Sequence, residues 1–338
     1  MSFDNDGPAL LRPGQKLARV SAGHGERVRI TLNGGMDALL LGAVAHLAAS
    51  PAEFPVVGDW VAARPVEPEL ALIERVIPRR SKISRRAAGR RDEEQVLAAN
   101  VDLALIVCGL DGDFNLRRLE RYLAIAYEGG VQPVIVLNKA DLHPDSGAAA
   151  GQVRQIAGRA AVLVISAQTG CGFEAIAALL RPGVTAVLLG SSGAGKSTIL
   201  NRILGAEAHK TAPARESDSR GRHTTTHREL IDLASGAALI DTPGLREIQI
   251  VAGDDSLTAV FDDIAELAVQ CRFADCSHSS EPGCAVRGAV DSGRLASFQK
   301  LRREAARAAD PRAEKQRWRS IHKAARRLYK ERDEERGW

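Results

Sequence analysis

The chain has 338 residues, and at about 150 residues per domain this length predicts two or three domains. Hydrophobic residues at 45% and charged residues at 26% lie near the averages for globular proteins, which argues against a disordered chain. The sequence has no apolar run approaching the roughly 18 residues of a membrane span, and its start lacks the features of a secretory signal. We therefore expect a cytoplasmic protein that makes no membrane contact.

Charge is distributed unevenly along the chain, although the formal net charge is only +4. Residues 285–338 hold 16 Lys and Arg against 8 Asp and Glu, and residues 78–91 hold seven basic residues and no acidic one. Basic runs of this kind are typical of proteins that bind a polyanion, and nucleic acid is favoured over lipid because no amphipathic anchor accompanies them. The alternative is a set of solvated helix faces, where alternating Arg and Glu are common.

Residues 1–96 are predicted to form a small β-barrel domain. Residues 16–77 contain several short segments with strand composition, separated by turn-forming residues. Val28, Ile30 and Leu32 alternate with other residues and are followed by a Gly-Gly pair, which indicates a hairpin. A five-stranded OB-type barrel fits this size, and that fold commonly binds nucleic acid.

From residue 97 the pattern becomes that of an α/β domain, which we place at 97–250. Residues 101–110 form a continuous apolar run, as expected for a strand buried on both faces, and residues 116–130 have the pattern of a helix that ends in glycines. Three more apolar segments each end in a polar loop, with helical sequence between them. The fold class is therefore α/β, a doubly wound parallel sheet whose ligands bind beyond the carboxyl ends of the strands. Residues 251–338 are predicted to form a helical domain.

The strongest motif is a glycine-rich loop, G-x4-G-K-S, placed after an apolar strand and before a helix. Backbone N–H groups of such a loop cradle phosphates, Lys196 can reach the β- and γ-phosphates, and the Ser197 hydroxyl can ligate Mg²⁺. The motif therefore predicts a nucleoside triphosphate site. Its predicted nucleotide contacts are Gly190, Ser191, Ser192, Gly193, Ala194, Gly195, Lys196, Ser197 and Thr198.

Further strand-end loops are predicted to complete a guanine nucleotide site. Asp241 ends another strand and can hold Mg²⁺ through water, while the N–H of Gly244 can approach the γ-phosphate. The Asp141 carboxylate can accept both the N1–H and the exocyclic amine of guanine, a donor pair that adenine lacks. The alternative for residues 138–141 is a helix N-cap, a role that Asp and Asn favour. The other base-loop residues predicted to act are Asn138, which would tie its loop to the phosphate loop, Lys139, Ala140, Ser166 and Ala167.

Together, N-K-x-D at 138–141, S-A at 166–167, the phosphate loop and D-x-x-G at 241–244 resemble the motifs of translation-factor-type GTPases. Ordinary GTPases begin with the phosphate loop, whereas here the base loops come first, which indicates a circular permutation. With V-G-D-W at 57–60, G-R-H-T-T-T at 221–226 and a C-terminal Cys/His pattern, the chain resembles the ribosome small-subunit-dependent GTPase A family.

That resemblance implies an OB domain, a permuted P-loop GTPase domain and a zinc domain. It also implies that the protein binds the small ribosomal subunit and its rRNA, hydrolyses GTP to GDP under stimulation by that subunit, and acts in its late maturation. We expect a monomer. From the residues alone two alternatives stay open: a P-loop phosphotransferase or ATPase, and an RNA-binding module in which the nucleotide is structural.

Residues 211–227 are polar and lack apolar periodicity, as expected for a loop that is ordered only when the γ-phosphate and Mg²⁺ are present. Of three adjacent threonines, Thr225 is the favoured Mg²⁺ ligand, and a strand start is the alternative. Leu245 stands where many GTPases have the glutamine that orients the attacking water, so catalysis by the protein alone is expected to be slow. His223 is the candidate to replace that glutamine; otherwise His223 is an exposed loop residue and the ribosome supplies the missing group.

Three cysteines and a histidine, Cys271, Cys276, His278 and Cys284, lie within 14 residues. Three thiolates and one imidazole complete a closed tetrahedral site, and closed sites of this type are structural, so we predict one structural Zn²⁺. Core thiols are the alternative, which the polar surroundings disfavour. Cys108 is predicted to be a core residue and Cys171 a loop residue.

The zinc site is expected to staple two basic helical segments, residues 295–308 and 315–332. Trp318 and Tyr329 lie among Arg and Lys in the second segment and could stack on RNA bases. The alternative for these aromatic residues is packing on a helix face.

Overall fold

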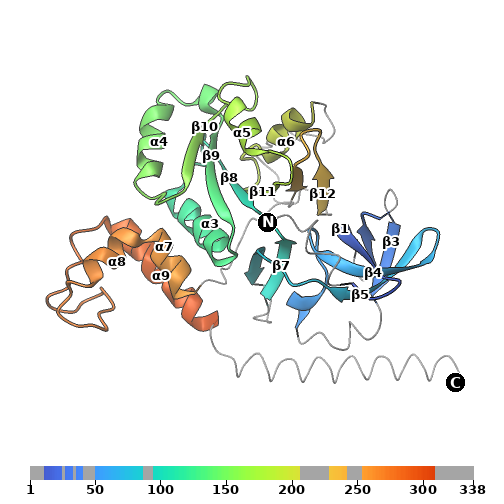
Figure 1. Cartoon of the computed structure of the whole chain (residues 1–338). Coiled ribbons are helices and arrows are strands. Elements are labelled where there is room, and N and C mark those ends of the chain that lie inside the picture. The colour runs from blue at the N-terminus through green and yellow to red at the C-terminus, as the bar shows by residue number, and fades with distance from the viewer. Residues whose placement is uncertain are drawn as a thin grey trace, which may run out of the picture.

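The computed structural model describes residues 11–24, 27–32, 36–40, 50–86, 94–205, 228–241 and 253–308. Figure 1 shows three parts along the chain: an N-terminal β-barrel in blue, a central α/β part in green and yellow, and a C-terminal group of helices in orange. The central sheet lies between the other two parts.

Five short strands form the barrel: β1 (Lys16–His24), β2 (Arg27–Ile30), β3 (Met36–Leu40), β4 (Trp60–Glu67) and β5 (Leu70–Val76). Their order is β1-β2-β3-β5-β4, and β4 pairs back with β1, which closes the barrel. Only β3 and β5 are parallel among these pairs. This arrangement is an OB-type barrel, as predicted, and it includes the expected hairpin of β2 and β3. A short 3-10 turn, η2 (Pro51–Glu53), precedes β4.

A two-stranded sheet of β6 (Lys82–Arg86) and β7 (Glu94–Ala99) connects the barrel to the central part, and the sequence did not predict it. Its backbone meets the end of helix α3 (Leu116–Glu128), where the Lys82 N–H donates to the Gly129 carbonyl at 2.9 Å. A Cβ on Gly129 would lie 1.7 Å from the Lys82 carbonyl oxygen, so glycine is required at this contact. The predicted domain boundary at 96/97 falls inside β7, and the boundaries stay a prediction.

The central sheet has the order β10-β9-β8-β11-β13-β12. The first five strands are parallel and β12 is antiparallel to β13. Buried residues fill β8 and β11 along their whole length, which agrees with the predicted doubly wound parallel sheet. The strands are β8 (Leu103–Gly109), β9 (Gln132–Asn138), β10 (Ala161–Val164), β11 (Thr185–Leu189), β12 (Glu229–Asp232) and β13 (Ala238–Asp241).

Helices cover both faces of this sheet. Alternate residues of β8 and β11 face opposite ways, so Ile106 and Val187 belong to the core beneath α3 and α4 (Ser146–Arg154). Leu105 and Leu188 belong to the core beneath α5 (Glu174–Leu179) and α6 (Lys196–Leu204). Polar loops at the carboxyl ends of the strands are therefore held between two packed layers.

Of the C-terminal helices, α7 (Asp254–Val260) and α9 (Ser292–Ala308) lie against α3, and α8 (Asp262–Ala268) packs beside α7, as Figure 1 shows. Phe261 is fully buried there and packs edge-on against Phe298 at 5.3 Å between ring centroids. Among the described helices, none has the length and apolar character needed to cross a membrane.

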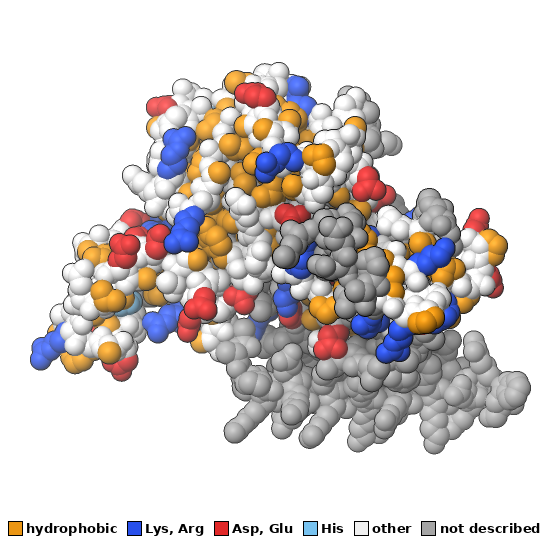
Figure 2. All heavy atoms as spheres, in the orientation of Figure 1, with side chains coloured by type: hydrophobic (Ala, Val, Ile, Leu, Met, Phe, Trp, Pro, Cys, Tyr) orange, Lys and Arg blue, Asp and Glu red, His pale blue; other side chains and the backbone are white. Residues whose placement is uncertain are grey.

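The face drawn in Figure 2 carries Lys and Arg side chains interspersed with Asp and Glu, without a large patch of one sign among the described residues. In the predicted basic stretch, Arg79 donates to the Asp59 carboxylate and to the carbonyls of Ala52 and Phe54. Lys82 pairs with Glu94 at 2.6 Å. Part of this basic charge is thus engaged inside the protein.

Candidate nucleotide site and metal centre

The predicted nucleotide loops all lie at the carboxyl edge of the central sheet. Asn138 ends β9, the Ser166 loop follows β10, the phosphate loop follows β11, and Asp241 ends β13. Because these strands are parallel, their carboxyl ends meet at one edge. The tertiary structure therefore brings together residues that are more than 100 positions apart.

Close packing shapes the phosphate loop. Gly190, Gly193 and Gly195 have φ values of 145°, 86° and 99°, which favour glycine. A Cβ on Gly190 would lie 2.3 Å from the Val107 carbonyl oxygen, and one on Gly195 would lie 2.2 Å from Asn138 Nδ2. The loop leads directly into α6, whose first turn holds Lys196, Ser197 and Thr198 and presents N–H groups suited to phosphate oxygens.

Asn138 connects the phosphate loop to both base loops. Its side chain is buried, its Nδ2 donates to the Ala194 carbonyl at 3.0 Å, and its Oδ1 accepts the Ala167 N–H at 2.9 Å. The predicted tie between Asn138 and the phosphate loop is confirmed. A buried amide that uses both its donor and its acceptor fixes the relative position of three loops.

The base loop itself is a tight turn. Lys139 has a left-handed backbone, with φ of 64°, and its ammonium pairs with Asp111. The Ala140 N–H donates to the Ile165 carbonyl at 3.1 Å, and Asp141 is exposed within the 3-10 turn η3 (Ala140–Leu142).

The helix N-cap alternative for residues 138–141 is wrong. No side chain caps η3, and the cap of the following helix α4 is Asp145, whose carboxylate accepts the Ala148 N–H. The buried Ser166 hydroxyl accepts the Thr169 N–H at 3.1 Å and so shapes its own loop.

Lys196 is directed along the phosphate loop. Its Nζ donates to the Gly190 carbonyl at 2.8 Å and to the Ser191 carbonyl at 2.6 Å. Burial lowers the pKa of Lys196, and the carboxylates of Asp241 and Asp113 oppose that shift. A half-buried ammonium beside carbonyl oxygens is well placed to meet an anionic ligand.

Asp113 and Arg118 are parts of this site that sequence reasoning missed. The Ser191 hydroxyl donates to the Asp113 carboxylate, which also forms an ion pair with Arg118. The available signal was position: Asp113 follows the carboxyl end of β8, the strand beside β11, and polar residues there face the ligand edge of a parallel sheet.

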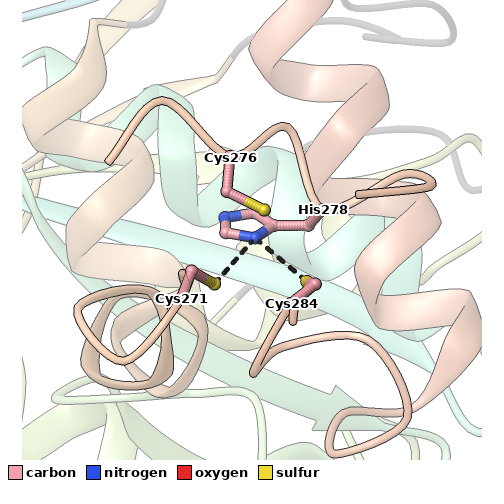
Figure 3. Close-up of side chains that lie close together, drawn as sticks. All are labelled: Cys271, Cys276, His278 and Cys284. Atoms are coloured by element: carbon pink, nitrogen blue, oxygen red, sulfur yellow. Dashed lines mark hydrogen bonds between the residues drawn. The ribbon is translucent and has the colours of Figure 1, made fainter. Parts of the chain in front are cut away.

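Figure 3 shows Cys271, Cys276, His278 and Cys284 pointing toward one another. Their ligand atoms all lie within 4.8 Å of one another, and the Sγ atoms of Cys271 and Cys284 are each 3.6 Å from His278 Nδ1. Three sulfur atoms and one ring nitrogen in this arrangement can hold a metal ion. The remaining described cysteines are elsewhere: Cys108 is buried in β8 and Cys171 is exposed in a loop, as predicted.

Backbone N–H groups support the sulfur atoms, as is typical around metal-bound thiolates. The Ala285 N–H lies 3.4 Å from Cys271 Sγ, and the Arg287 N–H lies 3.3 Å from Cys284 Sγ. Burial raises the pKa of Cys284, but hydrogen bonds from the backbone N–H groups of Arg287 and Val286 and from the neighbouring thiols outweigh that effect, so the pKa is lowered from its ordinary value. The Glu281 carboxylate accepts hydrogen bonds from the Ser277 hydroxyl and several backbone N–H groups, which lower its pKa to about 2.

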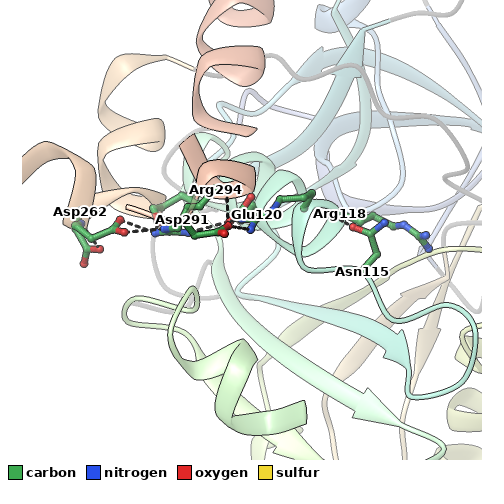
Figure 4. A network of polar contacts seen from close by, with 9 residues as sticks. Asn115, Arg118, Glu120, Asp262, Asp291 and Arg294 are labelled. Atoms are coloured by element: carbon green, nitrogen blue, oxygen red, sulfur yellow. Dashed lines mark hydrogen bonds and ion pairs between the residues drawn. The ribbon is translucent and has the colours of Figure 1, made fainter. Parts of the chain in front are cut away.

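The C-terminal helices are joined to α3 by a cluster of charged side chains, drawn in Figure 4. Arg294 of α9 donates to the fully buried Glu120 at 2.9 Å and to both oxygens of Asp263 at 2.6 and 2.7 Å. Its guanidinium also lies 4.8 Å from the ring centroid of Phe261. Arg117 pairs with Glu120 as well, at 2.5 Å. The part that holds the Cys/His cluster is thus tied to a helix of the central α/β part.

Comparison with known proteins is consistent with this geometry. A family model described as RsgA GTPase matches residues 76–251. A relative from Opitutus terrae, named small ribosomal subunit biogenesis GTPase RsgA, is 50% identical over 332 residues, covering 91% of this chain and 90% of the relative. The chain belongs to the RsgA GTPase family. As an RsgA-family protein it is a GTPase, and the family resemblance deduced from its motifs is confirmed.

Matches to other proteins also cover most of this RsgA-family chain. A relative from Lactiplantibacillus plantarum, named small ribosomal subunit biogenesis GTPase RsgA 2, is 46% identical, covering 86% of this chain and 84% of the relative. Two solved structures share the fold. YjeQ from Thermotoga maritima has a TM-score of 0.63 and 24% sequence identity, and the match covers 86% of this chain and 99% of that chain. YloQ, described as a circularly permuted GTPase, has a TM-score of 0.57 and 21% sequence identity, and the match covers 88% of this chain and 96% of that chain.

Several predicted residues of this RsgA-family chain lie outside the described residues. They are Thr225, His223, Gly244 and Leu245, together with Trp318 and Tyr329 of the basic tail. Their assigned roles stay predictions, as do the nucleotide contacts assigned to the loops described above.

Proposed function

We propose that this GTPase binds the small ribosomal subunit and acts in its late maturation, with GTP hydrolysis stimulated by the subunit. The relatives that span about nine-tenths of the chain carry small-subunit biogenesis in their names, which supports the subunit as partner. The observation that carries the nucleotide site is Asn138, because its one buried amide joins the phosphate loop to both base loops.

In this proposal, the phosphate loop and Lys196 bind the triphosphate, and Asp141 recognises guanine. Asp141 is exposed at the ligand edge, while Lys139 beside it is held by Asp111, which suits a flat base lying along the Lys139 stem. Asn138, Ala140, Ser166 and Ala167 shape the base pocket through the backbone contacts already described.

Oxygen atoms suited to Mg²⁺ lie beside the phosphate loop. The Ser197 hydroxyl is exposed in the first turn of α6, and Asp241 ends the strand that pairs with β11 opposite Leu188. These two residues would hold the ion, with Thr225 as a further ligand and Gly244 at the γ-phosphate. When bound, Mg²⁺ neutralises charge that develops on the phosphates during hydrolysis.

Zinc fits the Cys/His cluster. The donor set is three sulfur atoms and one nitrogen, and four protein ligands complete a tetrahedral site without a position for water. We assign Cys271, Cys276, His278 and Cys284 as ligands of one structural Zn²⁺ that holds the loop between α8 and α9.

The remaining parts of the proposal concern the partner and the cell. The barrel and the basic residues after 284 would contact rRNA phosphates, the protein would act as a monomer, and it would work in the cytoplasm where small subunits mature. His223 or a ribosomal group would supply the function of the glutamine that Leu245 replaces.

Two other functions are weaker. An ATPase or phosphotransferase would not need a carboxylate at Asp141, and competition of labelled GTP by ATP tests it. An RNA-binding module with a structural nucleotide would bind GTP without turnover, and single-turnover hydrolysis tests that alternative.

The deciding experiment measures GTP turnover by the full chain alone and with small subunits, large subunits or naked rRNA. We expect slow turnover alone and strong stimulation by small subunits only, and Lys196→Ala should abolish the stimulated rate. Equal stimulation by large subunits, or by naked rRNA, would contradict the proposed partner. Full turnover by Lys196→Ala would contradict the proposed site.

A further inference from the structure

A carboxylate lies directly against the phosphate loop. Asp113, in the segment between β8 and α3, accepts the hydroxyl proton of Ser191, the second residue of that loop. The Asp113 side chain is mostly buried, with 18% of its surface exposed. An unpaired negative charge here would oppose the binding of a triphosphate.

Arg118 neutralises the charge of Asp113. It lies in the first turn of α3 and pairs with the Asp113 oxygen that Ser191 does not use, so the carboxylate is engaged from both sides. Asn115 caps the same helix by accepting the Arg118 N–H at 3.0 Å, as Figure 4 shows, which fixes the start of α3. Asp113 is thus held by the helix that follows it in the chain.

Ser191 links Asp113 to Lys196. The Ser191 carbonyl accepts a hydrogen bond from Lys196 Nζ at 2.6 Å, while the Ser191 hydroxyl is bonded to Asp113. Ser191 therefore contacts Asp113 through its side chain and Lys196 through its backbone. The Asp113 carboxylate and the Lys196 ammonium are thus linked by two hydrogen bonds that meet at one residue.

We propose that Asp113 is a positioning residue for GTP hydrolysis, which holds Ser191 so that the phosphate loop keeps Lys196 aligned with the phosphates. Arg118 keeps Asp113 from repelling the substrate. Asp113 does not touch the nucleotide and acts only through Ser191. This inference rests on the proposed role of the phosphate loop.

The same helix carries the charged cluster that binds the C-terminal part. Arg117 and Arg121, on either side of Arg118 in the helix, pair with Glu120 and Glu304. Because Arg118 is presented by a helix fixed in this way, the phosphate loop is held against a rigid support rather than against a lone loop.

The test is a double-mutant cycle in the full chain with Asp113→Ala, Ser191→Ala and both together. Each single variant should lower kcat/KM for GTP by about tenfold, the effect of losing one hydrogen bond to a charged group. The double variant should be no worse than either single variant, because both remove the same contact. Asp113→Asn keeps an acceptor oxygen and should recover part of the loss.

Asp102→Ala is the matched control. Asp102 also joins β8 to β11 through its carboxylate, which accepts the Thr185 N–H at 2.8 Å, but it lies at the opposite end of these strands. We expect it to lower the temperature at which GTPase activity is lost on heating, without changing kcat/KM below that temperature. If Asp113→Ala does not fold, the cycle is run with Asp113→Asn, which keeps the size of the side chain, against Ser191→Ala, which removes only one hydroxyl.

Multiplicative losses in the double variant would overturn the inference, since they would show that Asp113 acts independently of Ser191. Unchanged kcat/KM in Asp113→Ala would overturn it as well. Lys196→Ala distinguishes a failure of the proposed nucleotide site from a failure of the proposed role of Asp113. If Lys196→Ala abolishes turnover and Asp113→Ala leaves it unchanged, the phosphate-loop assignment stands and only the role of Asp113 is wrong. If Lys196→Ala keeps full turnover, the proposed site itself falls.

Discussion

Removing the charge of Arg294 in α9 should destabilise the contact between α3 and α9 more than removing the charge of Glu120 in α3. Arg294→Met keeps an aliphatic stem over Phe261 but leaves Glu120, which has no exposed surface, with Arg117 as its remaining partner among the described contacts. Breaking a buried ion pair from one side costs about 3–5 kcal/mol, and the remaining Arg117 places this case near 3.

The opposite change is milder because Arg294 has other partners. Glu120→Met leaves Arg294 with both oxygens of Asp263 and with the Val260 carbonyl at 3.0 Å. We expect a cost of about 1–2 kcal/mol, the value of a lost hydrogen bond to a charged group. The double variant should be more stable than Arg294→Met alone, because it removes the stranded carboxylate.

Global unfolding is a poor assay here, since a chain with several parts does not unfold in one step. Hydrogen exchange of the α9 amides, followed by mass spectrometry, reports the local opening of this contact. The expected gap between the single variants corresponds to roughly a tenfold difference in opening. Equal effects of the two single substitutions, or a double variant less protected than Arg294→Met, would refute the reasoning.

Three further results are expected. Asp141→Asn should weaken GTP binding by at least tenfold and favour xanthosine triphosphate, because the new amide matches its C2 oxygen; competition binding of the two nucleotides checks this. With the metal bound, a thiol reagent should modify Cys171 quickly, and a chelator should release three more thiols, while Cys108 stays unreactive because burial raises its pKa to about 11. Burial raises the pKa of Asp263, but the hydrogen bonds from Arg294 lower it below the ordinary 3.8, so its stabilising contribution is present above that pH and is lost as the pH falls below it. The difference in α9 exchange between wild type and Asp263→Asn should therefore shrink in acid.

The sequence alone determined the elements whose signals are local. Continuous apolar runs identified β8, β9 and β11 because strands buried on both faces need no polar alternation. The glycine-rich loop and the Cys/His spacing could be recognised because their function depends on residues close together in the chain. Even the meeting of the base loops with the phosphate loop followed from one rule, since parallel strands place their carboxyl ends at one edge.

Tertiary structure decided whatever depends on partners distant in sequence. The β6–β7 sheet contacts Gly129 at the end of α3 through its backbone, and no local pattern in the sequence predicts that contact. Arg79 lies in a run that resembles a nucleic-acid footprint, yet Asp59 binds it within the protein. Asp113 shows the same limit. In the sequence it is an ordinary loop aspartate, and it contacts Ser191 only because β8 and β11 are neighbouring strands. Whether a charged side chain is exposed to solvent, paired with another residue or buried depends on the groups around it, and folding brings those groups together from distant parts of the sequence.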